Sequence, residues 1–240
     1  MGTEVIAARS MNTLYIWLDV AFLISFLIVL IWTKRYQALL AGLAGGIIYF
    51  LVDYGIFYLA LKTRVVTGAD TALFLLWLSM SYGFTNFAWI WLWLDRDGHA
   101  LEWSLFIMSG WLCVGLLSQS FGAGFALISI SRGTSGYHGI MALLLFIGYA
   151  ALVIHNIRKP DQRIAIGWIL AIGILVQGSW EFVLAITGIR NLSLQTFIVN
   201  TLLETNMGLP YLWMIHRAIG RCRNEDLSRA GTPAVQAAVP

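Results

Sequence analysis

Four acidic residues stand inside long apolar stretches of this chain, and each of them could do chemistry there. They are Asp19, Asp53, Glu181 and Glu204. Ionisable residues within membrane spans are rare, usually face a bundle interior or a cavity, and point to function. Because burial favours the neutral form of a carboxyl, we expect one or more of them to be protonated at neutral pH. Such a carboxyl can protonate an alkene or an epoxide, or it can carry protons in a relay.

Each acid follows a hydrogen-bonding side chain by four residues. The pairs are Tyr15 and Asp19, Tyr49 and Asp53, Gln177 and Glu181, and Asn200 and Glu204. A spacing of four places both groups on one helix face, so the pattern predicts polar stripes, which Asn86 and Asn206 could join. For Asp19, which is expected near the membrane surface, a structural or hydrated role is an equal alternative to function.

The composition is that of an integral membrane protein. Of the 240 residues, 59% are hydrophobic and 11% are charged, whereas soluble domains have roughly 25% charged residues. Seven stretches approach the length of about 20 residues that crosses a bilayer, near 12–32, 38–60, 71–94, 103–128, 139–157, 164–188 and 193–215. We therefore predict an all-α bundle of seven transmembrane helices over residues 1–216, and a basic, disordered tail over 217–240. Gly122 and Gly124 predict a tilt or a break near the end of the fourth span.

The distribution of Lys and Arg predicts the orientation of the bundle. The tail and the loops after odd-numbered spans hold Lys34, Arg35, Arg96, Arg158, Lys159, Arg163, Arg217, Arg221, Arg223 and Arg229. The opposite side holds Arg9, Lys62, Arg64, Arg132 and Arg190. The positive-inside rule then places the N-terminus outside and the C-terminus in the cytoplasm. The basic residues flank apolar runs, so they do not indicate a nucleic-acid partner.

The candidate catalytic residues are Asp53, Glu204 and Glu181, of which the first two lie deepest in their spans. No span carries a Lys or Arg at that depth, so Arg64 and Arg190, at the outer ends of spans two and six, are the nearest cations. For Glu181, the alternatives to catalysis are pairing with Arg190 and a hydrogen bond to a neighbouring helix.

Residues beside these acids are the candidates for binding a substrate. They are Tyr49, Phe57, Asn86, Trp180, Asn200 and Trp213. Aromatic faces stabilise cations, so the four aromatic members could line a cavity that holds a carbocation. Aromatic residues in a membrane bundle more often serve packing, and the three Trp residues within 89–93 are expected to form an aromatic belt.

Several other kinds of site have no signature in this sequence. Cys113 and Cys222 give neither a disulfide framework nor a metal-ligand spacing, and no Gly-rich phosphate loop occurs. We therefore expect no metal and no cofactor. The last span has no Lys for a retinal Schiff base, and the spans lack the Pro-Gln pair of small seven-helix carriers.

Two segments resemble the small seven-span membrane terpene cyclases, which close prenyl chains in fungal meroterpenoid and indole-diterpene pathways, and their bacterial relatives. KRYQALLAGLAGGIIYFLVDYGIFY, with Asp53, is similar to their second-span motif, and LLETNMGLPYLWMIHR, with Glu204, to their last-span motif. The resemblance covers chain length, span plan and these segments, about a quarter of the chain. Where this chain has Val52 and Asp53 the fungal proteins tend to have Trp-Glu, and in place of Glu204 they tend to have Asp. The QGSWEF stretch with Glu181 has no counterpart that we can place.

The resemblance implies a cofactor-independent cyclase of class II type, acting in the bilayer on a lipophilic prenylated molecule. Asp53 or Glu204 would protonate a terminal epoxide or alkene, and the other would orient the acid or take the final proton. The alternatives are a proton-coupled transporter, in which the acids form a relay, and a membrane assembly subunit, whose polar stripe binds partner helices.

Overall fold

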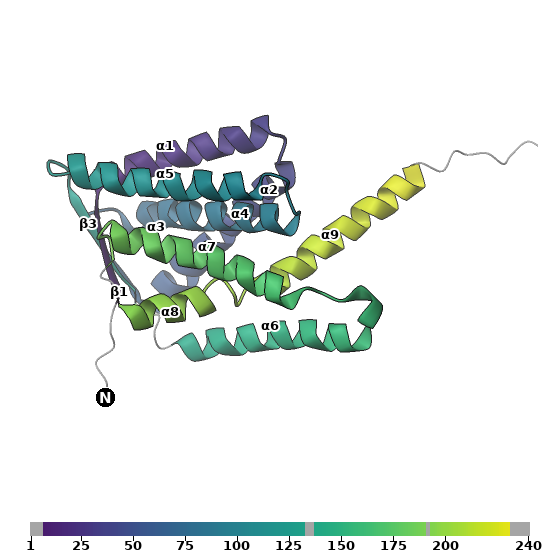
Figure 1. The fold of residues 1–240 in the computed structure, drawn as a ribbon. Coiled ribbons are helices and arrows are strands. Elements are labelled where there is room, and N and C mark those ends of the chain that lie inside the picture. Colours follow the sequence, from purple (N-terminus) through teal and green to yellow (C-terminus); the bar gives the residue numbers. More distant parts are fainter. Residues whose placement is uncertain (1–6, 133–136, 191–192, 231–240) are drawn as a thin grey trace, which may run out of the picture.

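The computed structural model describes residues 7–132, 137–190 and 193–230, and over these ranges the chain is mostly helical (Figure 1). Six helical segments in this part of the chain are long and apolar enough to cross a membrane. They span residues 13–32, 36–60, 71–94, 100–121, 138–158 and 160–186. The predicted helical bundle is confirmed, whereas the seventh predicted span is not one of these six segments.

The first three spans contain two stretches of π-helix. Their elements are α1 (Thr13–Trp32), α2 (Tyr36–Phe50), π-helix η1 (Leu51–Ala60), α3 (Thr71–Ser79), π-helix η2 (Met80–Phe84) and α4 (Thr85–Leu94). The side chains of Asn12 and Asp70 cap α1 and α3 by accepting backbone N–H bonds. Because a π-helix bonds i to i+5, it shifts side chains off the faces that a spacing of four predicts. Asp53 lies on such a segment.

The second half of the bundle ends in a broken helix. Its elements are α5 (Ala100–Phe121), α6 (His138–Arg158), the 3₁₀ turn η4 (Pro160–Gln162), α7 (Ile166–Ile186), α8 (Leu194–Leu203) and α9 (Leu209–Ala230). The prediction of one continuous helix over 193–215 is therefore wrong. Helix α8 ends at Leu203, and at 1.5 Å per residue it covers only about 15 Å. Pro210 lacks a backbone N–H, so it suits the first turn of a new helix rather than the interior of a continuous one.

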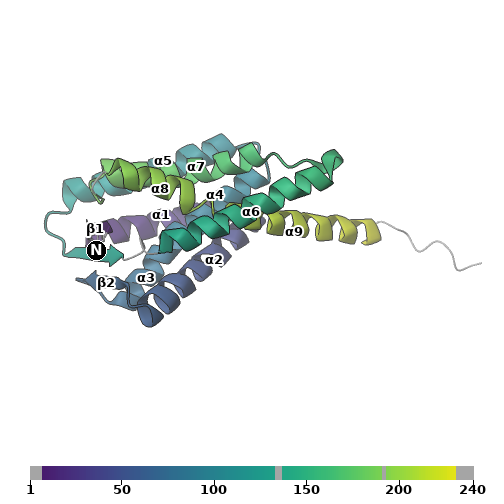
Figure 2. The same ribbon diagram turned by 90° about the horizontal axis from the view of Figure 1, so that it is seen from below.

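Helix α9 also overturns the boundary predicted between the bundle and a disordered tail. It begins at Leu209, inside the bundle, and runs through Arg217 to Ala230 without interruption. Figure 2 shows it leaving the bundle on the side away from the strands. The predicted tail is thus helical as far as Ala230, and residues 231–240 lie outside the described part of the chain.

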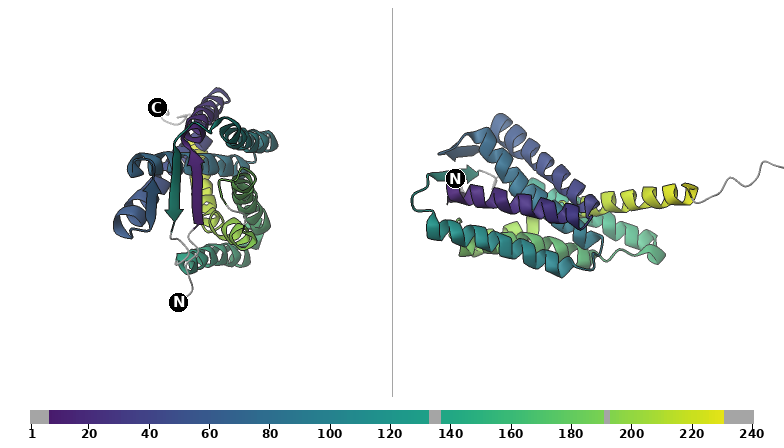
Figure 3. Two further views of the ribbon diagram at one scale, coloured as in Figure 1. Left: turned by 90° about the vertical axis from the view of Figure 1, so that its left-hand side faces the viewer. Right: turned by 90° about the horizontal axis from the view of Figure 1, so that it is seen from above.

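A small antiparallel sheet that the sequence reading did not anticipate closes one end of the bundle (Figure 3, left). Its strand order is β1 (Ala7–Asn12), β3 (Leu127–Arg132), β2 (Arg64–Thr67). The stretch LISISR alternates apolar and polar residues, which is the period of a strand, and it buries Ile128 and Ile130 on one face. The fourth predicted span ends accordingly at Phe121, just before Gly122, and not at residue 128.

The two predicted sets of basic residues lie at opposite ends of the bundle. Arg9, Arg64 and Arg190 belong to the sheet or to a bridge joined to it. At the other end, Arg35 pairs with Asp97 in the loop after α4. The structure thus separates the two sides, and the assignment of the sheet end to the outside stays a prediction.

The α3–η2–α4 segment forms the centre of the bundle. Trp89 and Trp91 on α4 are 0% and 4% exposed, and the Nε1 atoms of Trp89 and Trp93 donate to the Oγ of Ser104, at 2.8 and 3.2 Å. The predicted aromatic belt is wrong for Trp89 and Trp91, because they pack in the core. The indole N–H of Trp89 finds a partner there, as buried indoles generally require.

Close approach of α2 to η2 depends on glycine. A Cβ at Gly83 would lie 2.9 Å from both the carbonyl oxygen of Gly45 and the Cα of Gly46. Gly42 faces Phe84 in the same way, with a Cβ contact of 2.7 Å. The close packing predicted from the Gly42 and Gly46 pair is confirmed, as small residues let membrane helices approach.

Gly83→Ala should therefore destabilise the bundle, because the obstructing atoms are backbone and cannot rotate away. Overpacking of this kind costs about 1–3 kcal/mol, which should lower the melting temperature of the protein in detergent. Gly167→Ala on α7 is the matched control, since nothing lies within 4 Å of its added Cβ. Equal melting temperatures for the two variants would contradict the packing argument.

Candidate functional site

Asp53 is held by an arginine from the sheet. It is 4% exposed on η1, and Arg64, the first residue of β2, is 2% exposed. The Arg64 Nη2 and Nε atoms donate to Asp53 Oδ1 at 2.7 and 3.2 Å. The guanidinium carbon also lies 4.3 Å from the ring centroid of Phe57. Arg64 is thus confirmed as the cation beside Asp53, and Phe57 packs against its guanidinium.

Glu181 is paired in the same way at the end of α7. The Nη1 atom of Arg190 donates to Glu181 Oε2, and both residues are buried. A backbone bridge between Arg9 and Arg190, together with a bond from the Ser10 N–H to the Ile189 carbonyl, fixes this loop to β1. The predicted pairing of Glu181 with Arg190 is confirmed.

Gln177 connects the ion pair of Glu181 and Arg190 to Glu204. Its Nε2 donates to Glu181 Oε1 at 3.3 Å and to Glu204 Oε2 at 3.1 Å. Its Oε1 accepts from the Tyr82 hydroxyl at 2.5 Å and from the Thr205 hydroxyl at 2.6 Å. A side-chain amide has two N–H donors and two acceptor lone pairs, so Gln177 uses its full capacity. The pairing predicted between Gln177 and Glu181 is confirmed.

Glu204 lies at the break between α8 and α9, beside a pocket of about 200 Å³. The pocket is lined by Ile48, Tyr49, Val52, Asn86, Phe87, Ile90, Glu204, Thr205, Met207, Gly208, Leu209 and Leu212. Irregular backbone within a membrane protein is tolerated where it is buried in protein or lines a cavity, and this segment does both. Ile48 is 52% exposed, so the rim of the pocket reaches the outer surface of the bundle.

Asn86 gives this pocket an unsatisfied polar group. Its side chain is 1% exposed, and neither Nδ2 nor Oδ1 has a hydrogen-bond partner among the described residues. A buried amide without a partner costs free energy, and a hydrogen bond from a ligand in the pocket would offset that cost. Asn86, Tyr49 and Glu204, three of the predicted site residues, therefore share one pocket.

Glycines on two neighbouring helices make room for the break. A Cβ at Gly173 on α7 would lie 2.1 Å from Asn206 Oδ1, and one at Gly148 on α6 would lie 3.0 Å from the Pro210 ring. Asn206 is fully buried; its Oδ1 accepts from the Tyr149 hydroxyl at 3.2 Å, and its Nδ2 donates to the Thr201 carbonyl at 3.2 Å. The irregular turn thus satisfies its polar groups inside the protein.

Asp19 belongs to a separate environment between α1 and α3. It is fully buried, and the Trp77 Nε1 donates to its Oδ2 at 2.9 Å. The Tyr15 hydroxyl makes no hydrogen bond within the described ranges, so the predicted pairing of Tyr15 with Asp19 is wrong. Burial also contradicts the hydrated role that was one alternative for Asp19.

The remaining predicted residues lie apart from this pocket. Trp180 is buried between Tyr82 and Trp111, at centroid distances of 5.5 and 4.7 Å. Asn200 donates to Glu181 Oε1 at 3.3 Å across helices, and not to Glu204 as its spacing predicts. Trp213 lines another pocket, together with His155 and others. The predicted cavity lined by Tyr49, Phe57, Trp180 and Trp213 is therefore wrong.

Sequence reasoning missed Tyr82, Thr205 and Phe87 as parts of the site. Tyr82 and Thr205 bond Gln177, and Phe87 lines the pocket beside Tyr49. The Gly208 and Pro210 pair could have revealed the helix break. No group of three His, Cys, Asp or Glu side chains within the described ranges could hold a metal ion.

Arg64→Gln should lower the stability of the protein strongly, because it leaves Asp53 buried without this cation. Breaking a buried pair from one side costs about 3–5 kcal/mol. The double variant Arg64→Gln/Asp53→Asn should recover part of this loss, since neither charge remains. Melting temperatures in detergent measure both effects, with the exposed Arg163→Gln as control. Strictly additive losses in the double variant would contradict direct coupling.

Comparison with known proteins assigns no chemistry to this site. No family, no curated protein and no solved structure matches this chain. The chemistry of the pocket is accordingly inferred from the contacts, burial and charges described above.

Proposed function

We propose that this protein is a cofactor-independent membrane terpene cyclase in which Glu204 protonates the reactive end of a prenyl chain. The observation that carries the proposal is the pocket at the helix break, where a carboxyl and an unsatisfied amide, Asn86, share an otherwise mainly apolar lining. An apolar pocket with a few polar groups is the usual form of a small-molecule site.

Glu204 is better suited than Asp53 to donate the proton. Asp53 is bonded by the Arg64 guanidinium, whereas the side-chain partner of Glu204 is the neutral amide of Gln177. Glu204 has no cationic partner among the described residues. Asp53 and Arg64 then act as a structural pair, which joins the second span to strand β2.

The reaction is an isomerisation whose protons balance. The Glu204 carboxyl transfers its proton to an epoxide oxygen or to an alkene carbon, and the electron pair of the neighbouring alkene closes the ring at the cationic carbon. The last cation loses one proton to the Glu204 carboxylate, which restores the acid, so the product has the composition of the substrate. Tyr49 and Phe87 present aromatic rings to the pocket, and such rings stabilise cations.

The size and position of the pocket suit the end of a long chain. Its volume of about 200 Å³ is somewhat larger than the cavity of about 150 Å³ that binds benzene. One ring or prenyl unit would fill it, and the remaining chain would leave past Ile48 into the lipid. Asn86 would hydrogen-bond an oxygen of the substrate near the acid.

Glu204→Gln should abolish cyclisation while keeping the shape of the pocket. Loss of a general acid lowers rates by about 10²–10⁴-fold. The measurement is chromatography with mass spectrometry on membrane vesicles fed epoxyprenyl-aromatic substrates. Glu102→Gln, which removes an exposed carboxylate, is the matched control and should keep activity. Cyclised isomers that persist in Glu204→Gln would end the assignment.

The double variant Asp53→Asn/Arg64→Gln separates the two acids. If Glu204 is the donor, this variant should still form product, because it removes both members of the structural pair together. Complete loss of product, in double-variant protein that still elutes as a folded species in size-exclusion chromatography, would make Asp53 the acid instead.

A proton-coupled transporter is the second candidate, and the polar chain from Arg190 through Glu181 and Gln177 to Glu204 favours it. These contacts lead from the sheet end of the bundle to the pocket. Liposomes containing the protein and an internal pH dye test this function. Proton movement with a candidate solute that is lost in Glu181→Gln would support transport, and no flux under any gradient would exclude it.

A further inference from the structure

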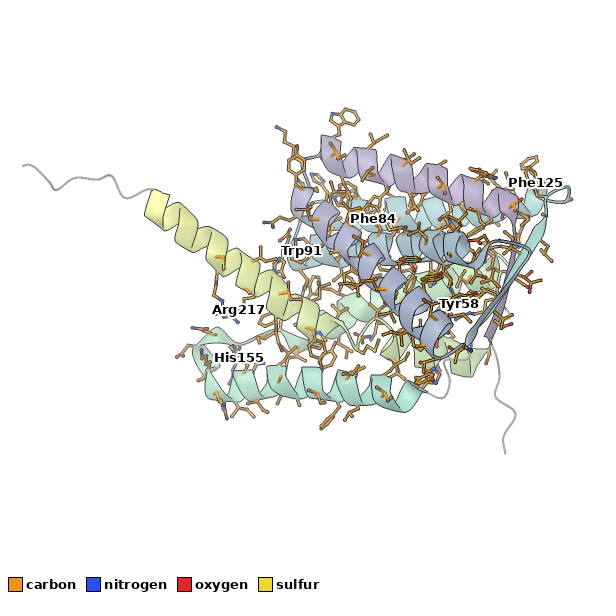
Figure 4. All side chains as sticks on the ribbon, turned by 180° about the vertical axis from the view of Figure 1, so that it is seen from behind. Tyr58, Phe84, Trp91, Phe125, His155 and Arg217 are labelled. Carbon is orange, nitrogen blue, oxygen red and sulfur yellow. The ribbon has the colours of Figure 1, made fainter. Side chains whose placement is uncertain are left out.

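A second pocket lies at the end of the bundle opposite the sheet. It has a volume of about 160 Å³, and its lining includes Leu152, His155, Ile164, Trp213, Arg217 and Arg221. It sits where α6 turns through η4 into α7 and where α9 passes them. Figure 4 shows His155 on α6 and Arg217 on α9 near this turn. Its lining contains two arginines and a histidine, and no Asp or Glu.

The Arg217 guanidinium is held in place by neutral groups. Its Nη2 donates to the Gln162 side-chain oxygen at 2.9 Å, and its Cζ lies 5.3 Å from the Trp213 ring centroid. A guanidinium has five N–H donors, so these contacts leave most of them available toward the pocket. A cation fixed in advance loses little freedom when it binds an anion.

His155 adds a second polar group that lacks a protein partner. Its Nε2 is buried, and within the described ranges no hydrogen bond reaches it. Asp95 and Asp97, at the same end of the bundle, are already paired with His216 and Arg35. Asp161 on η4 is exposed and does not line the pocket. The positive charge of Arg217 and Arg221 is thus not neutralised by any lining residue.

We propose that this pocket binds a phosphate group, brought by the headgroup of an anionic phospholipid or by a free phosphate. Arg217 and Arg221 would bind the phosphate oxygens in the bidentate manner that guanidinium favours. His155 would donate a further hydrogen bond, and the apolar wall at Leu152 and Ile164 would contact the carbons attached to the ester. Basic pockets between membrane helices near the bilayer surface have the chemistry that binds lipid headgroups.

Native mass spectrometry of the full chain tests the proposal, with phosphatidylglycerol and phosphatidylcholine offered in equal amounts. Wild type should retain phosphatidylglycerol, and Arg217→Gln/Arg221→Gln should retain about tenfold less, since charge-assisted hydrogen bonds are lost. Arg158→Gln/Arg163→Gln is the control, because both residues are exposed at the same end but do not line the pocket. It has the same change in charge and should bind as wild type does.

Isothermal titration with inorganic phosphate distinguishes the two sources. Phosphatidylglycerol binding that phosphate does not displace identifies a lipid site, and phosphate binding without lipid preference identifies a site for free phosphate. Both results support the proposal if they depend on Arg217 and Arg221. Equal losses in the two double variants, or no binding of either probe, would overturn it.

A single variant keeps the test decisive if the double variant elutes as aggregate in size-exclusion chromatography. Arg221 is exposed, so Arg221→Gln should fold normally. It should bind phosphatidylglycerol or phosphate several-fold more weakly than wild type does. If the double variant aggregates and Arg221→Gln binds as wild type does, the proposed phosphate site would be contradicted.

Discussion

A carboxylate inside an apolar bundle must have a partner, and the half of this protein nearest the sheet is arranged around that requirement. Removing an ion from water costs several kcal/mol unless charges and hydrogen bonds offset it. Arg64 meets this need for Asp53, and Arg190 meets it for Glu181. The strands fix both arginines, one as the first residue of β2 and the other through the bridge to β1. The sheet therefore positions cations as well as closing the bundle.

Glu204 is accommodated differently, by neutral groups and by a break in the helix. Gln177 joins Glu204 to Glu181 through the two hydrogens of one amide nitrogen. The irregular segment after Glu204 is possible because Gly173 and Gly148 leave room for it. Its polar groups find partners within the protein, as buried irregular backbone requires. Glu204 is thereby placed at a pocket without a counter-charge.

The two ends of the bundle differ in their electrostatics. At the sheet end, buried arginines are paired with carboxylates in a water-poor environment. At the other end, Arg217 and Arg221 line an open pocket that contains no acid. The proposed chemistry lies between these ends, near the middle of the bundle, where apolar and aromatic residues line the pocket around Glu204.

The sequence by itself determined the helical bundle, the short list of buried acids and the cations nearest to them. Hydrophobic length and local spacing carry that information, and the spacing of Gln177 and Glu181 indicated a real contact. Only the tertiary structure decided which acid faces a pocket. Asp53 and Glu204 stand in similar apolar stretches, and their difference arises from residues distant in sequence: Arg64 in a strand beside one, and Asn86 and Tyr49 across a pocket from the other. Local periodicity cannot specify such contacts, because a π-helix and a broken helix each rotate the following side chains away from the regular faces on which a spacing argument depends.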